Sequence, residues 1–136
     1  MINAVVRRLV NTPLAPPHTY LLTVRGRKTG RPHSTPVYLI EHGDERWLVA
    51  PYGQVGWVKN ARVAGEVTLS RRGRTASAAL EPLGPQESAS VLREYVQQVP
   101  VVRPFFEVND DAPVEQFAAE AADHPVFRLR PAVTAT

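Results

Sequence analysis

Runs of β-branched, aromatic and aliphatic residues divide the chain into short segments bounded by glycine, proline and aspartate. They predict six strands, over residues 19–25, 33–41, 46–51, 66–72, 74–82 and 125–131. The turn residues 42–44 join the second strand to the third, and Gly73 joins the fourth to the fifth, so most neighbouring strands pair as hairpins.

Helical spacing marks the remaining segments. Apolar residues at helical intervals predict short helices over 2–10 and 57–64, and a longer amphipathic helix over 85–99. A further helix is expected after Pro113, with an apolar stripe of Val114, Phe117, Ala118 and Ala121. About six strands with three to four flanking helices form an α+β, mainly β fold, and antiparallel hairpins of this kind avoid open edges by closing into a small barrel.

The composition fits this architecture. The chain has 136 residues, of which 43% are hydrophobic and 21% charged, so we expect residues 1–136 to form a single domain with the helix over 2–10 packed on it. The absence of cysteine excludes disulfides, thiolate metal sites and thiol catalysis. Arg7 and Arg8 interrupt the N-terminal apolar residues, and no apolar run is long enough to span a bilayer, so a cytoplasmic protein is expected.

The net charge of +3 has a local origin. Four basic side chains lie within residues 24–36, VRGRKTGRPHSTP, whereas the other twelve basic residues are outnumbered by thirteen acidic ones. The two glycines let the main chain turn close to a ligand, and Arg27, Lys28 and Thr29 offer donors to a phosphate or carboxylate. A strand follows rather than a helix, so this is not a Walker A loop. A solvated basic turn fits the same residues, and the residues alone leave both interpretations open.

A second candidate motif is APYGQVGWVKN, residues 50–60, in which a glycine-bearing loop opens a helix. Main-chain N–H groups at a helix start suit an anion, and Trp57 and Asn60 add an aromatic plane and an amide. The competing interpretation makes Trp57 a core anchor and Asn60 a surface polar group.

Other chemistry is not indicated. The four histidines lack the spacing of a metal pair, and no serine lies in a G-x-S-x-G elbow, so neither a metal site nor a serine nucleophile is expected. A second basic cluster, Arg71, Arg72 and Arg74, is predicted to be a solvated hairpin tip. Neither basic cluster has interleaved aromatic residues, so nucleic acid is not an expected partner.

The two motifs occur in the order found in the deazaflavin-dependent nitroreductase family, which the chain resembles from about residue 20 to residue 82 and again over 125–131. The family pattern Gly-Arg-Lys-Ser/Thr-Gly followed by proline corresponds to GRKTGRPHSTP, and Trp-x-x-Asn corresponds to GWVKN. The resemblance implies an antiparallel split β-barrel related to flavin-binding pyridoxamine-phosphate oxidases. It also implies an oxidoreductase that moves a hydride between coenzyme F420 and a small apolar, quinone-like or nitro-type acceptor.

The resemblance assigns roles residue by residue. Arg27, Lys28 and Thr29 would hold the phosphate and acidic tail of the cofactor. The ring would be lined by Pro36, Val37 and Tyr38, and the site would be completed by Gly53, Trp57 and Asn60. Tyr38 is also the candidate catalytic residue, as a donor of a hydrogen bond or proton to the substrate.

Three cofactor positions depart from the family pattern. His33 stands where the family often has arginine, and Pro51 and Tyr52 stand where it often has serine and lysine, which removes fixed charge from the tail site. Phe105 and Phe106 replace a tyrosine-rich pattern around the substrate, so the identity of the substrate is not implied.

Several alternatives stay open at this stage. The same barrel could bind FMN as an oxidoreductase, or hold a cofactor or lipid without turnover. The sequence does not choose between monomer and homodimer, and it leaves room for contact with a membrane surface through a helix.

Overall fold

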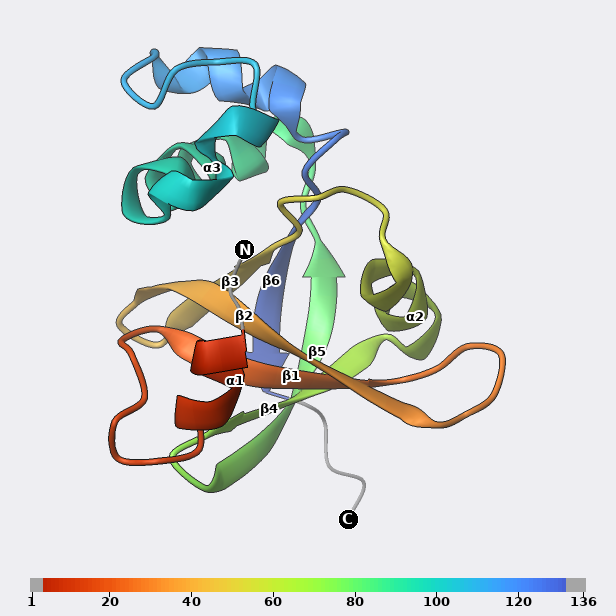
Figure 1. The fold of residues 1–136 in the computed structure, drawn as a ribbon. Helices are drawn as coiled ribbons and strands as arrows, with labels where there is room; N and C mark the ends of the chain where they lie inside the picture. Colours follow the sequence, from red (N-terminus) through yellow and green to blue (C-terminus); the bar gives the residue numbers. More distant parts are fainter. Residues whose placement is uncertain (1–3, 132–136) are drawn as a thin grey trace.

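Six antiparallel strands close into a barrel in the computed structural model, which describes residues 4–131 (Figure 1). The strands are β1 (Thr19–Arg25), β2 (Pro32–His42), β3 (Glu45–Val49), β4 (Glu66–Arg71), β5 (Arg74–Pro82) and β6 (Val126–Pro131). Their order around the barrel is β1-β2-β3-β6-β5-β4, and β4 pairs with β1 to close it. The predicted mainly β fold, a barrel built from hairpins, is confirmed.

Every strand contributes side chains to the core inside the barrel, because alternate side chains of each strand point inward. Its buried members include Leu22, Leu39, Leu48, Leu69 and Phe127. Helix α2 (Gly56–Ala64) adds Val58 and Ala61 to this core, which places the helix over one end of the barrel. Its C-cap, Gly65, has a φ of 76° and donates its N–H to the carbonyl of Ala61, so the predicted stop signal is confirmed.

A second core lies outside the barrel. It is formed against β2, β3 and β6 by α3 (Pro85–Gln98) and the 3-10 helices η1 (Pro100–Phe105) and η2 (Val114–Glu120), which make the layer above the barrel in Figure 1. β3 is buried on both faces, since Leu48 points into the barrel while Trp47 and Val49 pack beneath α3. The chain therefore folds as a barrel with one helical layer on its outer wall.

The helix predicted after Pro113 differs in type from the expectation. It is the 3-10 helix η2, Val114–Glu120. A period of three residues places Phe117 and Glu120 on the same side, and both are buried. The short helix thus serves the second core rather than forming an independent amphipathic element.

The N-terminal helix α1 (Ala4–Leu9) lies within the predicted range 2–10, of which residues 2 and 3 are outside the described part. Arg7 Nη2 donates to the carbonyl oxygen of Ser34 at 2.7 Å, which ties α1 to β2. Over residues 4–131, none of the helices has the length and apolar character that crossing a membrane requires.

Arg71 is not part of a solvated tip, contrary to the prediction. It is half-buried, and its Nη1 donates to the carbonyl oxygens of Pro16 at 2.7 Å and Thr19 at 3.0 Å. Arg71 therefore fastens the segment before β1 to the end of β4. Arg72 and Arg74 are exposed, as predicted.

Candidate functional site

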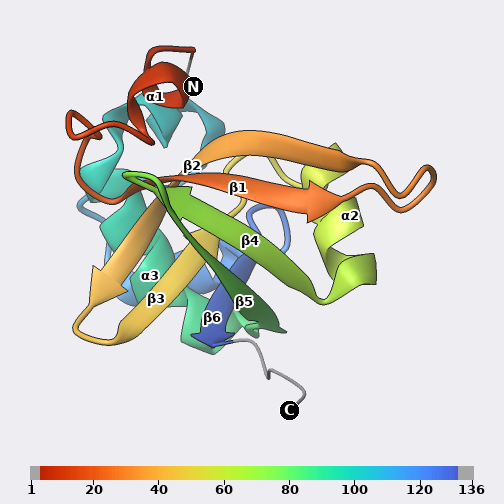
Figure 2. The ribbon, with the colours of Figure 1, turned by 90° about the horizontal axis from the view of Figure 1, so that it is seen from below.

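The basic turn, residues 26–31, joins β1 to β2 beyond the barrel wall, on the same side as α2 (Figure 2). The turn is held by main-chain bonds from Gly26 N to the oxygen of Arg31, 2.8 Å, and from Gly30 N to the oxygen of Gly26, 2.9 Å. A Cβ on Gly26 would lie 2.9 Å from Nε2 of His33. Glycine at this position therefore lets the His33 side chain lie across the base of the turn.

Asn60 of α2 connects the two predicted motifs. Its Oδ1 accepts a hydrogen bond from the main-chain N of Arg27 at 3.1 Å and another from Arg27 Nη1 at 2.7 Å. Asn60 is buried, with 9% of its surface exposed, so the alternative interpretation as a surface polar group is wrong. Because the Asn60 amide is neutral, it orients Arg27 without cancelling its charge.

The donors of the basic turn face solvent without acidic partners. Arg27, Lys28 and Thr29 are exposed, and none of the ion pairs within residues 4–131 includes a residue of the turn. Thr29 Oγ1 accepts a hydrogen bond from Arg31 N at 3.2 Å, which leaves its hydroxyl hydrogen to donate elsewhere. The turn thus presents uncompensated donors to an anion.

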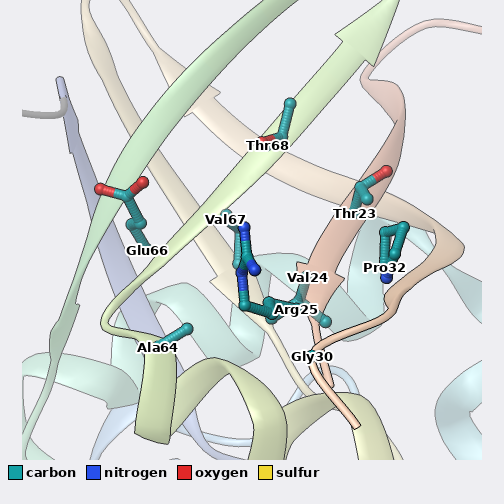
Figure 3. A pocket seen from close by; sticks show the side chains of 9 residues that line it. All are labelled: Thr23, Val24, Arg25, Gly30, Pro32, Ala64, Glu66, Val67 and Thr68. Carbon is teal, nitrogen blue, oxygen red and sulfur yellow. The ribbon is translucent and has the colours of Figure 1, made fainter. Parts of the chain in front are cut away.

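A cavity of about 420 Å³ opens beside this turn, where β1 and β4 separate beyond the Thr23–Thr68 pair (Figure 3). The Arg25 side chain extends across it towards β4, and Glu66 lies on the opposite wall. The cavity also reaches Gly30 of the turn and Ala64 at the end of α2. None of the sequence-predicted cofactor residues lines it, so it adds Arg25 to the charged surroundings of the turn.

The β3–α2 loop, residues 50–55, forms a second cavity, of about 350 Å³. Three predicted residues line it together, Pro51, Tyr52 and Gly53. Phe105 of η1 completes its aromatic side: its ring meets the Tyr52 ring edge to face with centroids 4.8 Å apart, and 55% of Phe105 is exposed. The result is an accessible aromatic wall beside a loop that leads into α2.

The loop is held in place by residues that the sequence did not indicate. His124 Nδ1 donates to the carbonyl oxygen of Pro51 at 2.7 Å, and the His124 ring stacks on Phe106 with centroids 3.8 Å apart. Gly53 has a φ of 82°, and a Cβ there would lie 3.2 Å from the carbonyl oxygen of Asp123. His124 is 73 positions from Pro51, so no local pattern could have found this contact.

Tyr38 lies on the outer face of β2, beneath α3. Its Oη donates to Gln98 Oε1 at 2.8 Å, and its ring lies 6.3 Å from the ring of Tyr95. Burial, reinforced by the carboxylates of Glu41 and Glu94, raises the pKa of Tyr38, so the phenol keeps its proton at neutral pH. Tyr38 lines neither of the two cavities described above.

The buried Tyr95 lies between Tyr38 and Tyr52, and both neighbours add to the effect of burial in raising its pKa. Burial also raises the pKa of Tyr52. Protonated phenols therefore extend from β2 to the β3–α2 loop.

Three other predicted residues have clear positions. The Val37 side chain is buried inside the barrel, so any contact it makes with a ligand on the outer face of β2 would come from its main chain. Trp57 is half-buried and packs against the interior core, in agreement with its interpretation as a core anchor. Pro36 is half-buried in β2 and pairs with Leu21.

Within residues 4–131, no three side chains of the metal-binding types gather closely enough to hold a metal ion.

Comparisons with known proteins agree with this architecture. The model of the F420H(2)-dependent quinone reductase family matches residues 3–110, whereas no curated protein matches the chain. The structure of an F420-H2 dependent reductase, FDR-A, is 16% identical, covers 84% of this chain and 95% of its own, and has a TM-score of 0.58.

Two further solved structures share the fold. The protein Atu2129 from Agrobacterium tumefaciens, of unknown function, is 17% identical with a TM-score of 0.62, covering 84% of this chain but only 48% of its own. A FAD-binding protein from Mesorhizobium loti is 16% identical with a TM-score of 0.54, covering 96% of this chain and 91% of its own. At these identities the structures establish the fold alone, whereas the family model covers most of the chain. The chain therefore belongs to the F420H(2)-dependent quinone reductase family, which confirms the predicted resemblance and the class of F420-dependent oxidoreductases that it implied.

Proposed function

We propose that this protein transfers a hydride between coenzyme F420 and a planar, apolar acceptor of the quinone type. The observation that carries the proposal is the pair of hydrogen bonds from Arg27 to Asn60, which hold the basic turn against α2 and support a site shared by both. The family supports the same class of acceptor, since its description names a quinone reductase.

The donor set suits an anionic cofactor. Arg27, Lys28 and Thr29 are exposed and free of acidic partners in the described part, as a phosphate-bearing, acidic tail requires. His33, across the base of the turn, stands where a fixed charge is common in the family. We therefore assign the tail to the basic turn, with Lys28 as a main contributor of charge.

The ring and the acceptor are assigned to the side of the β3–α2 loop. Pro51, Tyr52 and Gly53 share a cavity with the half-exposed Phe105, and flat aromatic walls favour a flat apolar ligand. When bound, F420 supplies the hydride chemistry at its deazaflavin ring, so the protein has to bind, orient and exclude water rather than provide a nucleophile.

Tyr38 has a narrower role in this proposal. Its phenol stays protonated because burial raises its pKa, and its Oη already donates to Gln98 Oε1. Tyr38 lies outside the cavity of the β3–α2 loop, so this role requires an acceptor that extends to the outer face of β2, where the phenol would donate a hydrogen bond or proton as the acceptor is reduced.

The proposal is tested by titrating the purified protein with F420 and, separately, with FMN, each followed by fluorescence. We expect saturable binding of F420 and turnover of a soluble quinone with reduced F420. Binding of FMN without binding of F420 would favour the flavin alternative, and binding of F420 without reduction of any quinone would favour a cofactor carrier.

Replacement of Lys28 tests the assignment of the tail. The Lys28→Ala variant should bind F420 about 1–3 kcal/mol more weakly, the range for loss of a charged hydrogen bond, and the loss should shrink as salt is added. Arg8→Ala removes the same charge from the exposed face of α1 and should bind F420 as the wild type does. An unchanged dissociation constant for Lys28→Ala would remove the turn from the site.

A further inference from the structure

The end of the barrel opposite to the basic turn holds a cavity of about 540 Å³. Figure 2 shows this end with the β4–β5 and β2–β3 turns, on the other side of the molecule from α2. Leu69, a member of the interior core, forms the floor of the cavity, and Tyr20, which packs on the same core, forms part of its wall. The cavity is therefore the open end of the barrel interior.

Four arginines surround this opening, Arg46, Arg71, Arg72 and Arg74. Arg46 comes from β3, which is not a neighbour of β4 or β5 in the barrel, so its charge faces the others from a different wall. The guanidinium carbons of Arg46 and Arg71 lie 5.8 and 5.9 Å from the centroid of the Tyr20 ring. Cationic groups from separate strands thus converge on a single concave space.

Two of these arginines are occupied by the protein itself. Arg71 donates to the carbonyl oxygens of the segment before β1, and Arg72 Nη2 donates to the carbonyl oxygen of Pro13 at 3.1 Å. Arg46 and Arg74, in contrast, pair with no carboxylate within residues 4–131. Arg74 is exposed, and Arg46 lies against the neutral Tyr20 side chain, so both keep their charge for a ligand.

The acidic residue closest in register is already engaged. Glu41 opposes Arg46 across the β2–β3 ladder, but its Oε2 accepts from Tyr20 Oη and its Oε1 lies 2.8 Å from His18 Nδ1. The single Glu41 carboxylate offsets at most one of the four arginine charges, so the opening keeps a net positive charge.

We propose that this open barrel end is a second binding site, for a small molecule that carries a phosphate or pyrophosphate group. Planar guanidinium groups match phosphate oxygens two at a time, and several of them around one space favour a ligand with more than one negative charge. The volume falls in the range of small-molecule pockets, and its concave shape suits such a ligand better than the backbone of a nucleic acid. The site lies apart from the proposed cofactor site and does not depend on it.

The test is a nuclear magnetic resonance titration of the ¹⁵N-labelled full chain with pyrophosphate. We expect saturable shifts of the amide signals of Tyr20, Arg46 and residues 71–76. The Arg46→Gln/Arg74→Gln variant should bind pyrophosphate about tenfold more weakly or worse. The Arg8→Gln variant, with a single charge removed from α1, should keep the wild-type affinity.

The results of this titration distinguish binding at the barrel opening from binding at the proposed cofactor site and from binding to a membrane surface. Shifts confined to residues 26–31 and 56–60, or an unchanged affinity in the double variant, would overturn the proposal. Binding to phosphatidylglycerol vesicles that depends on Arg46 and Arg74, without saturable pyrophosphate binding, would overturn it in favour of a membrane surface. If the double variant does not fold, the Arg74→Gln single variant replaces it in the titration. Arg74 is exposed, so this variant should fold, and the proposal requires it to bind pyrophosphate more weakly than the wild type. F420 titration of the same variants reports on the other site independently.

Discussion

Among single residues, Asn60 has a central structural role, because its side-chain amide oxygen accepts hydrogen bonds from both the main chain and the side chain of Arg27. An Asn60→Asp variant keeps an acceptor at this position but adds a negative charge beside the basic turn. We expect its urea unfolding midpoint to stay at or above the wild-type value. Its affinity for F420 should fall by about 1–2 kcal/mol, the repulsion between charges several ångströms apart at an effective dielectric constant near 20.

The Asn60→Ala variant provides the contrast. It removes the acceptor without adding charge, so the unfolding free energy should fall by about 1–2 kcal/mol as the Arg27 N–H loses its partner. Cofactor affinity should fall less than in Asn60→Asp. If both variants lost affinity equally, Asn60 would act on the cofactor only through the shape of the turn and not through charge.

Gly53 determines the backbone conformation of the β3–α2 loop. Its positive φ and its approach to the Asp123 oxygen both oppose a side chain, so Gly53→Ala should displace the loop and lower the unfolding free energy by about 1–2 kcal/mol. F420 affinity should fall with it. Gly43→Ala is the matched control: Gly43 also has a positive φ, 59°, but no atom lies within 4 Å of a Cβ there. Gly43→Ala should lose less stability than Gly53→Ala and keep the wild-type affinity for F420, whereas equal affinities in both variants would exclude the loop from the site.

At the scale of elements, Arg71 acts as a tie between β4 and the segment before β1. Replacing it with glutamine removes charged hydrogen bonds to the Pro16 and Thr19 carbonyls, and we expect a loss of about 2–3 kcal/mol in unfolding free energy by urea denaturation. Arg74→Gln removes the same charge from an exposed position that has no ion-pair partner in the described part of the chain, and it should stay within about 0.5 kcal/mol of the wild type. Similar losses in both variants would mean that net charge, rather than the tie, stabilises this end.

The same elements show what a sequence can and cannot predict here. The bounds of β1 and β6 follow from local composition, and Gly65 marked the end of α2, because these features depend on neighbouring residues. The bond between Asn60 and Arg27 spans 33 positions and required the barrel to bring α2 beside the β1–β2 hairpin. The prediction for Arg71 was wrong for a similar reason: a hairpin tip is usually solvated, but here Arg71 donates to the segment before β1, 55 positions away in the sequence.

In the molecule as a whole, the apolar interior of the barrel separates the proposed cofactor site from the proposed phosphate site. The basic turn and α2 lie at one end of the barrel and the arginine-lined opening at the other, with residues such as Leu22 and Phe127 buried between them. The helical layer on the outer wall then supplies the aromatic side of the proposed cofactor site through Phe105. A barrel closed on itself can carry both sites without either interrupting its ladder of hydrogen bonds.

The titration of the four tyrosines tests whether their side chains are buried in solution. The pKa of each is raised above 10.0, chiefly by burial, in Tyr20, Tyr38, Tyr52 and Tyr95. A raised pKa means that the folded chain binds the phenolic proton more tightly than the unfolded chain does. The corresponding stability is complete below pH 10 and is lost as the pH rises through the native values. Tyrosinate absorbance should therefore appear at higher pH in the native protein than in urea, and the urea midpoint should fall above pH 10. Tyr95→Phe keeps the packing and should flatten that fall, whereas native tyrosines that titrate as they do in urea would contradict the burial of these side chains in solution.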